Sequence, residues 1–459
     1  MAVPICVPRG FADWGATWIG ANDVGVIEGL VVLLIAAAVV AVVARWIRLP
    51  YTLALLLLGL VLGAVPGIPV PTLNSEVILL LFLPPLLFEA AFVLDLRLLW
   101  SVRTGVLVFA VPGVLLAMVV GGAIVHWGLG LPWAVALLFG ATIAATDPVA
   151  VLATFRQLGV SPRLAALLEG ESLLNDGVAL ALLVTLVMAV EGEFSIGPAV
   201  VTFVLSVVGG VAVGLALGWV GHRLIATIDE HLTEMTVSVA MAYGAFLVAE
   251  SLHLSGVLAT VSAAMTLGYL GRARGWIYSD GSERLLTDLW EFLAFVANAA
   301  LFLLMGLTVH VAGLTEYPGA VLVGIAAALA GRAGVAYGLG AFLPRWGFPL
   351  SWAERHVVFW GGLRGAVALA AVLSLPAGFP YRAQLLAMTY GAVLFTLLVQ
   401  GLTIAPVVQR LGLLECLASR RAPIRIPPGA EGTPMRVPDA SSQETGIRSR
   451  GTGSYDGCP

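Results

Sequence analysis

Lysine is absent from this sequence, and cysteine and charge are scarce. All 23 basic residues are arginines, and only 11% of the 459 residues are charged, against roughly a quarter in soluble domains. Without lysine there is no Schiff-base chemistry. Cys6, Cys416 and Cys458 lie near the two ends without metal-ligand spacing, so neither a disulfide framework nor a structural zinc site is indicated. The net charge of −4 leaves no basic face for nucleic acid.

Long apolar runs dominate the sequence instead, and hydrophobic residues make up 60% of it. We count about thirteen runs of roughly 17 to 28 residues, each long enough to cross a bilayer as a helix. Their expected ranges are 26–44, 51–66, 77–93, 105–126, 133–155, 167–190, 198–224, 233–252, 255–271, 287–309, 318–343, 354–375 and 384–411. The sequence therefore predicts an all-α polytopic membrane protein with a transmembrane domain over 26–411, and it excludes soluble enzyme classes.

The two ends and the loops indicate an orientation in the membrane. Residues 1–25 are expected to be an extracellular leader, and the Pro-, Gly- and Ser-rich residues 412–459 a disordered cytoplasmic tail. If the N-terminus is outside, the inside loops hold Arg45, Arg48, Arg97, Arg103, Arg156, Arg163, Arg223, Arg272, Arg274, Arg284, Arg345 and Arg355. The outside segments hold only Arg9 and Arg382. This bias predicts an odd number of spans in the cell membrane, with the C-terminus in the cytoplasm.

Five ionisable residues fall inside spans, where each costs about 2.5 to 3.5 kcal/mol on insertion scales. They are Asp147, Glu171, Asp176, Arg332 and Arg364. Such groups must pair, face water or be neutralised, which makes the set a candidate functional site. The alternative is a set of ion pairs that only join helices, and for Arg332 this means neutralising a neighbouring acid.

Two spans carry interruptions, the fifth at Asp147-Pro148 and the twelfth at Gly361–Gly365. Proline removes a helical hydrogen bond and disfavours helix at the residue before it. The two interruptions lie seven spans apart, and this odd offset predicts inverted repeats. Paired interruptions in corresponding halves are typical of a transporter site at the midplane.

The expected cation ligands come from the fifth and sixth spans. Opening the helix at Thr146 would free carbonyl and hydroxyl oxygens, and Glu171, Ser172, Asn175 and Asp176 share one face of a helix turning about 100° per residue. This set of oxygens suits Na⁺, K⁺ or protons and lacks the His or Cys expected for zinc or copper. Burial disfavours a charged carboxylate, so Asp176 would hold either a proton or a cation, and that competition is already an exchange mechanism.

Arg364 needs a buried acid as partner. Glu171 is our candidate, because pairing it with Arg364 would leave Asp176 free to bind and release protons. Pairing of Arg364 with Asp176 would hinder proton exchange instead, and the sequence leaves the choice open.

At this point the chain resembles the sodium/proton antiporters of the NhaP type, the relatives of eukaryotic sodium/hydrogen exchangers in the first family of the cation:proton antiporters. The resemblance covers about residues 26–411. It depends on LPYTLALLLLGLVLG, FLPPLLFEAAF, ATDPVAV, EGESLLNDGVAL, AESLHLSGVLA, WEFLAFVANAALFLLMGL and GGLRGAVALA.

The resemblance implies an NhaA-like fold whose unwound spans 5 and 12 cross at the midplane, in a homodimer. Dimerisation helices would cover about 26–93 and 198–309, and core helices about 105–190 and 318–411. The Na⁺ ligands that the resemblance implies are Asp176, Glu171, Ser172 and Thr146. It also implies that Asn175 lies beside Asp176 and that Asp147 lies at the crossing. Arg364 would bridge to Glu171, and Arg332 would be a second arginine of the site. Asn175 at its position resembles the pattern of electroneutral members, which exchange one cation per proton.

The sequence thus predicts a secondary antiporter of a prokaryotic cell membrane that exchanges Na⁺ or Li⁺ for H⁺ by alternating access and is not an enzyme. No phosphate-binding loop is visible, so no nucleotide and no other cofactor is expected. The expected partners are monovalent cations, protons, the lipid bilayer and a second copy of the chain. The alternatives are K⁺/H⁺ antiport by the same fold, a cation channel, a non-transporting sensor, or an intramembrane hydrolase that uses paired acids.

Overall fold

In the part of the chain that the computed structural model describes, the regular elements are all helices. That part comprises residues 35, 37–40, 42, 46, 51–63, 65, 75–147, 149–192, 196–228, 230–274, 282–308, 315–376 and 378–413. The chain divides into a helical unit, Met1–Glu415, and a second unit, Cys416–Pro459. The second unit, the expected leader 1–25 and most of the expected tail 412–459 lie outside the described residues.

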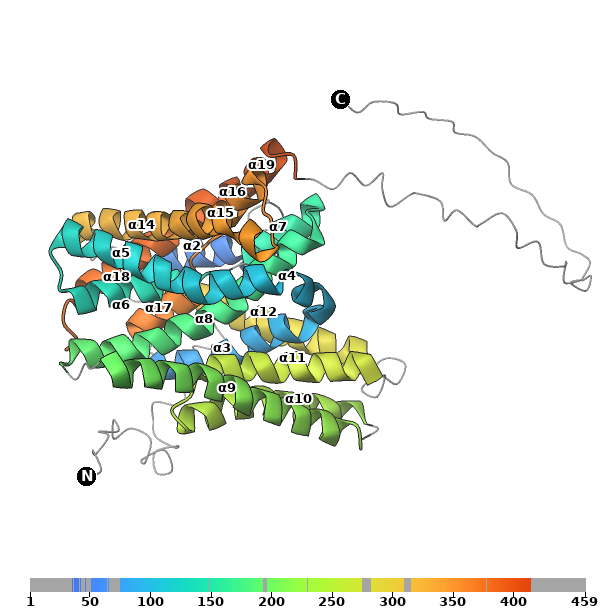
Figure 1. The fold of residues 1–459 in the computed structure, drawn as a ribbon. Helices are drawn as coiled ribbons and strands as arrows, with labels where there is room; N and C mark the ends of the chain where they lie inside the picture. Colours follow the sequence, from blue (N-terminus) through green and yellow to red (C-terminus); the bar gives the residue numbers. More distant parts are fainter. Residues whose placement is uncertain are drawn as a thin grey trace, which may run out of the picture. The chain divides into compact units, whose positions relative to one another are not determined.

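The helices of the first unit run roughly side by side (Figure 1). In chain order they are α2 (Tyr51–Gly63), α3 (Ser75–Val93), α4 (Leu96–Val108), the π-helix η1 (Phe109–Gly113), α5 (Val114–Leu129), α6 (Trp133–Ala144), α7 (Val149–Leu158), α8 (Pro162–Val190), α9 (Ile196–Ile225), α10 (His231–Ser251), α11 (Gly256–Arg274) and α12 (Ser282–Thr308). They continue with α14 (Pro318–Ala333), the π-helix η2 (Gly334–Leu339), α15 (Gly340–Phe342), the 3-10 helix η3 (Leu343–Trp346), α16 (Trp352–Trp360), α17 (Ala366–Leu373), α18 (Arg382–Phe395), the π-helix η4 (Thr396–Gln400) and α19 (Gly401–Arg410).

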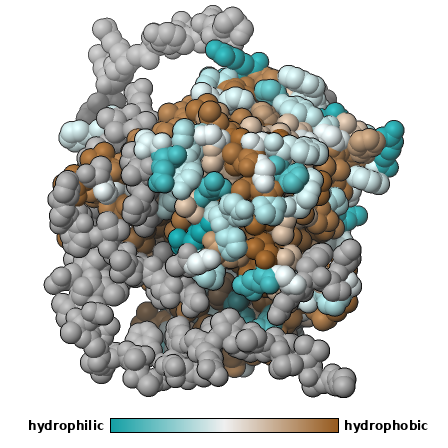
Figure 2. Space-filling view, turned by 90° about the vertical axis from the view of Figure 1, so that its left-hand side faces the viewer, coloured by the Kyte–Doolittle hydropathy of each residue, from teal (hydrophilic) through white to brown (hydrophobic). Residues whose placement is uncertain are grey.

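Seven helical segments among the described residues are long and apolar enough to span a membrane. The longest, Leu96–Leu129, has 34 residues, which at about 1.5 Å per residue is ~51 Å, well beyond a hydrocarbon core of about 30 Å. Figure 2 looks at one end of the helices and shows hydrophilic residues spread over that end between apolar ones. The chain is therefore a multi-pass membrane protein.

Each expected span from 51–66 onward overlaps either one helical segment of the structure or a pair of helices separated by a break. The first expected span, 26–44, lies largely outside the described residues, so the total of thirteen stays a prediction. The sequence did not predict the π-helical segments η1, η2 and η4, which interrupt three otherwise continuous spans.

Small residues let neighbouring helices approach closely where lipid provides no hydrophobic driving force. A Cβ atom on Gly306 of α12 would lie 2.7 Å from the Cα atom of Gly59 on α2. On the α5 and α6 pair, a Cβ atom on Gly140 would lie 2.9 Å from the backbone nitrogen of Gly122. Both distances are too short for real side chains, so these crossings need glycine.

Candidate functional site

The fifth expected span is broken, as the sequence predicts. The helix α6 ends at Ala144, the next residue adopts an extended conformation with φ −56° and ψ 135°, and α7 begins only at Val149. Pro148 lies at the point of interruption, where it removes a backbone donor and disfavours helix at Asp147. The backbone groups of 145–147 are thereby free to bind other partners.

The twelfth expected span is broken as well. The helix α16 ends at Trp360 and α17 begins at Ala366, so that Gly361–Gly365 runs without helical structure between them. The two breaks contact each other, because the backbone N–H of Asp147 donates to the carbonyl oxygen of Leu363 with an N···O distance of 2.8 Å. A Cβ atom on Gly365 would lie 2.9 Å from Cγ of Asp147. The two interruptions therefore lie in direct contact.

Opposite charges face the helix ends at this contact. The Asp147 carboxylate accepts a hydrogen bond from the Val149 N–H at 3.0 Å, at the positive N-terminus of α7. The Arg364 guanidinium donates to the carbonyl oxygen of Ala145 at 3.1 Å, just beyond the negative C-terminus of α6, and to that of Ala328 at 3.3 Å. Each charge thus satisfies backbone groups that the broken helices leave without intrahelical partners.

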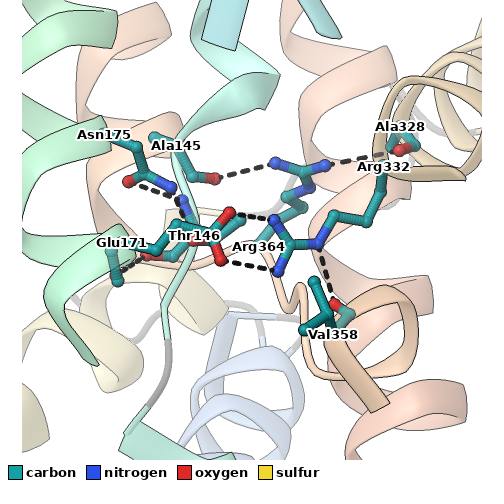
Figure 3. Close-up of polar contacts among 9 residues, drawn as sticks. Ala145, Thr146, Glu171, Asn175, Ala328, Arg332, Val358 and Arg364 are labelled. Atoms are coloured by element: carbon teal, nitrogen blue, oxygen red, sulfur yellow. Dashed lines mark hydrogen bonds and ion pairs between the residues drawn. The ribbon is translucent and has the colours of Figure 1, made fainter. Parts of the chain in front are cut away.

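Helix α8 contacts the first break through its polar face (Figure 3). Ser172 donates its hydroxyl to the Thr146 carbonyl oxygen. The Asn175 side-chain amide donates to the Thr146 hydroxyl at 2.7 Å, and the Asn175 carbonyl accepts a long bond of 3.5 Å from the Thr146 N–H. Two of the residues that the sequence placed on one face, Ser172 and Asn175, therefore contact a single unwound residue.

Asp176 lies on the same buried face of α8, and 7% of its surface is exposed. Its Oδ1 atom is buried and has no hydrogen-bond partner among the described residues. A buried carboxylate oxygen without a partner costs free energy unless it binds a proton or a cation. Asp176 is thus an acid at this site whose bonding is incomplete, and the buried Nε atom of Arg364 likewise has no partner among the described residues.

Glu171 does not pair with Arg364, so that prediction is wrong. Both carboxylate oxygens of Glu171 accept hydrogen bonds from Arg332, Oε2 from Nη2 at 3.1 Å and Oε1 from Nη1. The Arg332 side chain can extend to Glu171 because Gly362 has no side chain. A Cβ atom on Gly362 would lie 2.7 Å from Cδ of Arg332. The Nη1 and Nη2 atoms of Arg364 donate instead to backbone carbonyl oxygens. Arg332 neutralises a neighbouring acid, which is the alternative that the sequence left open for it.

The chain matches a known family over most of its length. The family described as sodium/hydrogen exchanger, transmembrane, matches residues 31–410. The chain belongs to the sodium/hydrogen exchanger family. This is a family of transporters, as the sequence predicts.

Similar proteins agree with this assignment. The exchanger is 40% identical over 380 residues to the Na⁺/H⁺ antiporter ApNhaP of Aphanothece halophytica, covering 82% of this chain and 72% of that protein. It is 37% identical over 409 residues to the Na⁺/H⁺ antiporter NhaH of Halobacillus aidingensis, covering 86% and 99%. Its fold resembles the sodium proton antiporter MjNhaP1 of Methanocaldococcus jannaschii with a TM-score of 0.72 at 22% identity, covering 86% of this chain and all of that one.

Sequence reasoning missed several contacts that hold the site of the exchanger together. The hydroxyl of Thr396, in the π-helix η4, accepts a hydrogen bond from the Arg364 N–H at 3.1 Å. Arg332 also donates from Nε to the Val358 carbonyl oxygen at 2.9 Å, in the last turn of α16. Thr396 is one of three threonines in its apolar span, with Thr389 and Thr403, so the sequence did not single it out, and no local signal marks a backbone carbonyl.

The contact between the two breaks predicts an effect of a single methyl group at Gly365. We expect Gly365→Ala to lower exchange by on the order of tenfold or more, because the new Cβ atom would push Asp147 and the first break away. Initial exchange rates in proteoliposomes measure this. Gly338→Ala in η2 is the matched control, because a Cβ atom there meets nothing within 4 Å. Equal rates in the two variants would show that the close approach at Gly365 is not needed.

Proposed function

We propose that this exchanger is a secondary antiporter that moves Na⁺ out of the cytoplasm in return for H⁺, with cation and proton competing for Asp176. The observation that carries the proposal is the buried Oδ1 atom of Asp176, which has no partner among the residues that the structure describes and lies on the face of α8 that contacts the break between α6 and α7. The names of ApNhaP and NhaH, both called Na⁺/H⁺ antiporters, support Na⁺ as the cation.

The proposed cation site takes oxygen atoms from α8 and from the first break. Asp176 supplies the charge, and the hydroxyl and carbonyl oxygens of Thr146 and the hydroxyl of Ser172 are the neutral ligands, with Asn175 holding Thr146 in place. Hard monovalent cations prefer such oxygens. Glu171 was expected to be a ligand, but both its oxygens are engaged by Arg332. We therefore propose that Glu171 fixes α8 relative to α14 and does not bind the ion.

Asp147 and Arg364 have a complementary role in this proposal. They lie at the crossing and neutralise helix ends that point toward each other. Occupation of Asp176 by one cation or by one proton leaves the same net charge in the membrane, which favours electroneutral exchange.

The proposed architecture is the one that the resemblance implies: thirteen spans in inverted repeats, with the N-terminus outside and the C-terminus in the cytoplasm. Core helices would cover 105–190 and 318–411, and dimerisation helices 26–93 and 198–309 of a homodimer. The packing of α9 against α10 and α11, and of α11 and α12 against α3, supports the second group. Gradients alone would drive the cycle, without cofactor, nucleotide or covalent chemistry.

Transport in proteoliposomes tests the proposal. Under an imposed pH gradient we expect Na⁺ or Li⁺ to dissipate the gradient at a rate that does not change when the membrane potential is clamped, because exchange of one cation per proton moves no net charge. Response to K⁺ instead would indicate a K⁺/H⁺ antiporter. A rate that follows the membrane potential would refute the electroneutral mechanism, and no response to any cation would favour the sensor.

A further inference from the structure

Two arginine–aromatic pairs lie on adjacent elements at one end of the helices. On α4, the Arg103 guanidinium lies over the Trp100 ring, 4.8 Å from its centroid, and donates to the Trp100 carbonyl oxygen at 2.8 Å. On η3, the Arg345 guanidinium lies 4.9 Å from the centroid of Phe342. The helix α4 packs against η3. Both guanidinium groups are therefore held on rings at a shared edge.

The arginines of this edge outnumber its acids. Arg97, Arg103 and Arg345 are exposed, and in the described part of the chain none of them forms an ion pair within 4 Å. Asp95 is the nearest acid along α4, and its carboxylate is used to cap that helix, accepting from the N–H groups of Arg97 at 2.8 Å and Leu98 at 3.4 Å. The charges are therefore available to an external anion.

Both elements lie at the ends of segments that are long enough to extend beyond the hydrocarbon core of a bilayer. The continuous helix Leu96–Leu129 has 34 residues, about fourteen more than a bilayer needs, and Arg97 and Arg103 lie in its first turns. Arg345 lies one residue before the end of the segment Pro318–Trp346. Trp100 and Trp346 are 69% and 54% exposed, as expected of tryptophans at a membrane interface.

We infer that this edge binds the phosphate group of an anionic phospholipid in the cytoplasmic leaflet. We name it the basic rim, and it consists of Arg97, Trp100, Arg103, Phe342, Arg345 and Trp346. Guanidinium groups bind phosphate oxygens through their planar fork, and stacking on a ring orders them beforehand. The exposed tryptophans would lie along the glycerol and upper acyl chains. The assignment to the cytoplasmic leaflet rests on the orientation proposed above.

Lipid binding to the purified full-length exchanger in detergent tests the inference, with native mass spectrometry counting bound molecules. The probes are phosphatidylglycerol and phosphatidylcholine with the same acyl chains. We expect preferential binding of phosphatidylglycerol, and loss of about fivefold in that binding for each arginine removed in Arg103→Gln and Arg345→Gln. No preference for phosphatidylglycerol, or an unchanged preference in the double variant, would overturn the inference.

Three controls make the result specific. Arg223→Gln removes an arginine that also stacks on a tryptophan, Trp219 at 5.5 Å, but lies on α9, so phosphatidylglycerol binding should be retained. Inorganic phosphate at millimolar concentration should not displace the lipid, and displacement would show that the rim binds free phosphate instead. Asp176→Asn should bind lipid like the wild type, so a failure of the proposed exchange would remain distinguishable from a failure of the rim.

Discussion

Replacing Asp176 with asparagine should abolish cation/proton exchange and leave the protein folded. The buried Oδ1 atom of Asp176 has no partner among the described residues, so the position is suited to an ion whose arrival and departure drive the cycle. Asparagine has nearly the same volume but can neither carry a proton nor neutralise a cation. We expect the rate in proteoliposomes to fall to that of protein-free liposomes with Na⁺, Li⁺ or K⁺.

The control for this experiment is an acid-to-amide change elsewhere on the same helix. Glu191 caps the C-terminal end of α8 and is exposed, so Glu191→Gln should transport at the wild-type rate. Thermal unfolding in detergent should be similar for both variants, because neither change opens a cavity. Full exchange by Asp176→Asn would remove the basis of the proposed mechanism.

Removing Arg332 should destabilise the exchanger strongly, by about 3 to 5 kcal/mol, because it leaves the Glu171 charge buried without a partner. The side chains of the pair are only 5% and 2% exposed, so solvent cannot replace the lost partner. We expect Arg332→Met to show a much lower unfolding temperature and a lower yield. Adding Glu171→Gln should restore much of the stability, since the uncompensated charge is then gone.

A second pair of variants distinguishes this ion pair from the one expected from the sequence. Arg364→Met removes an arginine that donates to the carbonyls of Ala145 and Ala328, so Glu171→Gln should restore little of its stability. The measurement is the coupling between the two substitutions in each double-mutant cycle, taken from unfolding free energies. Stronger coupling of Glu171 with Arg364 than with Arg332 would contradict the pairing in this structure.

Much of the site could be predicted from the sequence because its signals are local. The break before Pro148 and the break among Gly361, Gly362 and Gly365 follow from the conformational restrictions of proline and the freedom of glycine. The polar face of α8 follows from helical periodicity, because residues three and four apart lie on the same side. None of these features depends on how the helices pack.

The arginine that pairs with Glu171 could not be predicted from local sequence signals. Arg332 and Arg364 are both buried arginines within reach of the same region, and nothing near either residue in the sequence distinguishes their partners. The rotation of α14, together with the space left by Gly362, brings Arg332 to Glu171. The position of the carbonyl groups of Ala145 and Ala328 then gives Arg364 its own acceptors.

The sequence by itself determined that this protein crosses a membrane many times, where two of its spans break and which helix face carries the acids. These properties follow from chain chemistry and periodicity over a few neighbouring residues. Only the tertiary structure decided that the breaks contact each other, that Arg332 holds Glu171 and that an oxygen of Asp176 is left without a partner in the described part of the chain. Those outcomes depend on distances of a few ångströms between residues far apart in the chain, which are set by close helix packing.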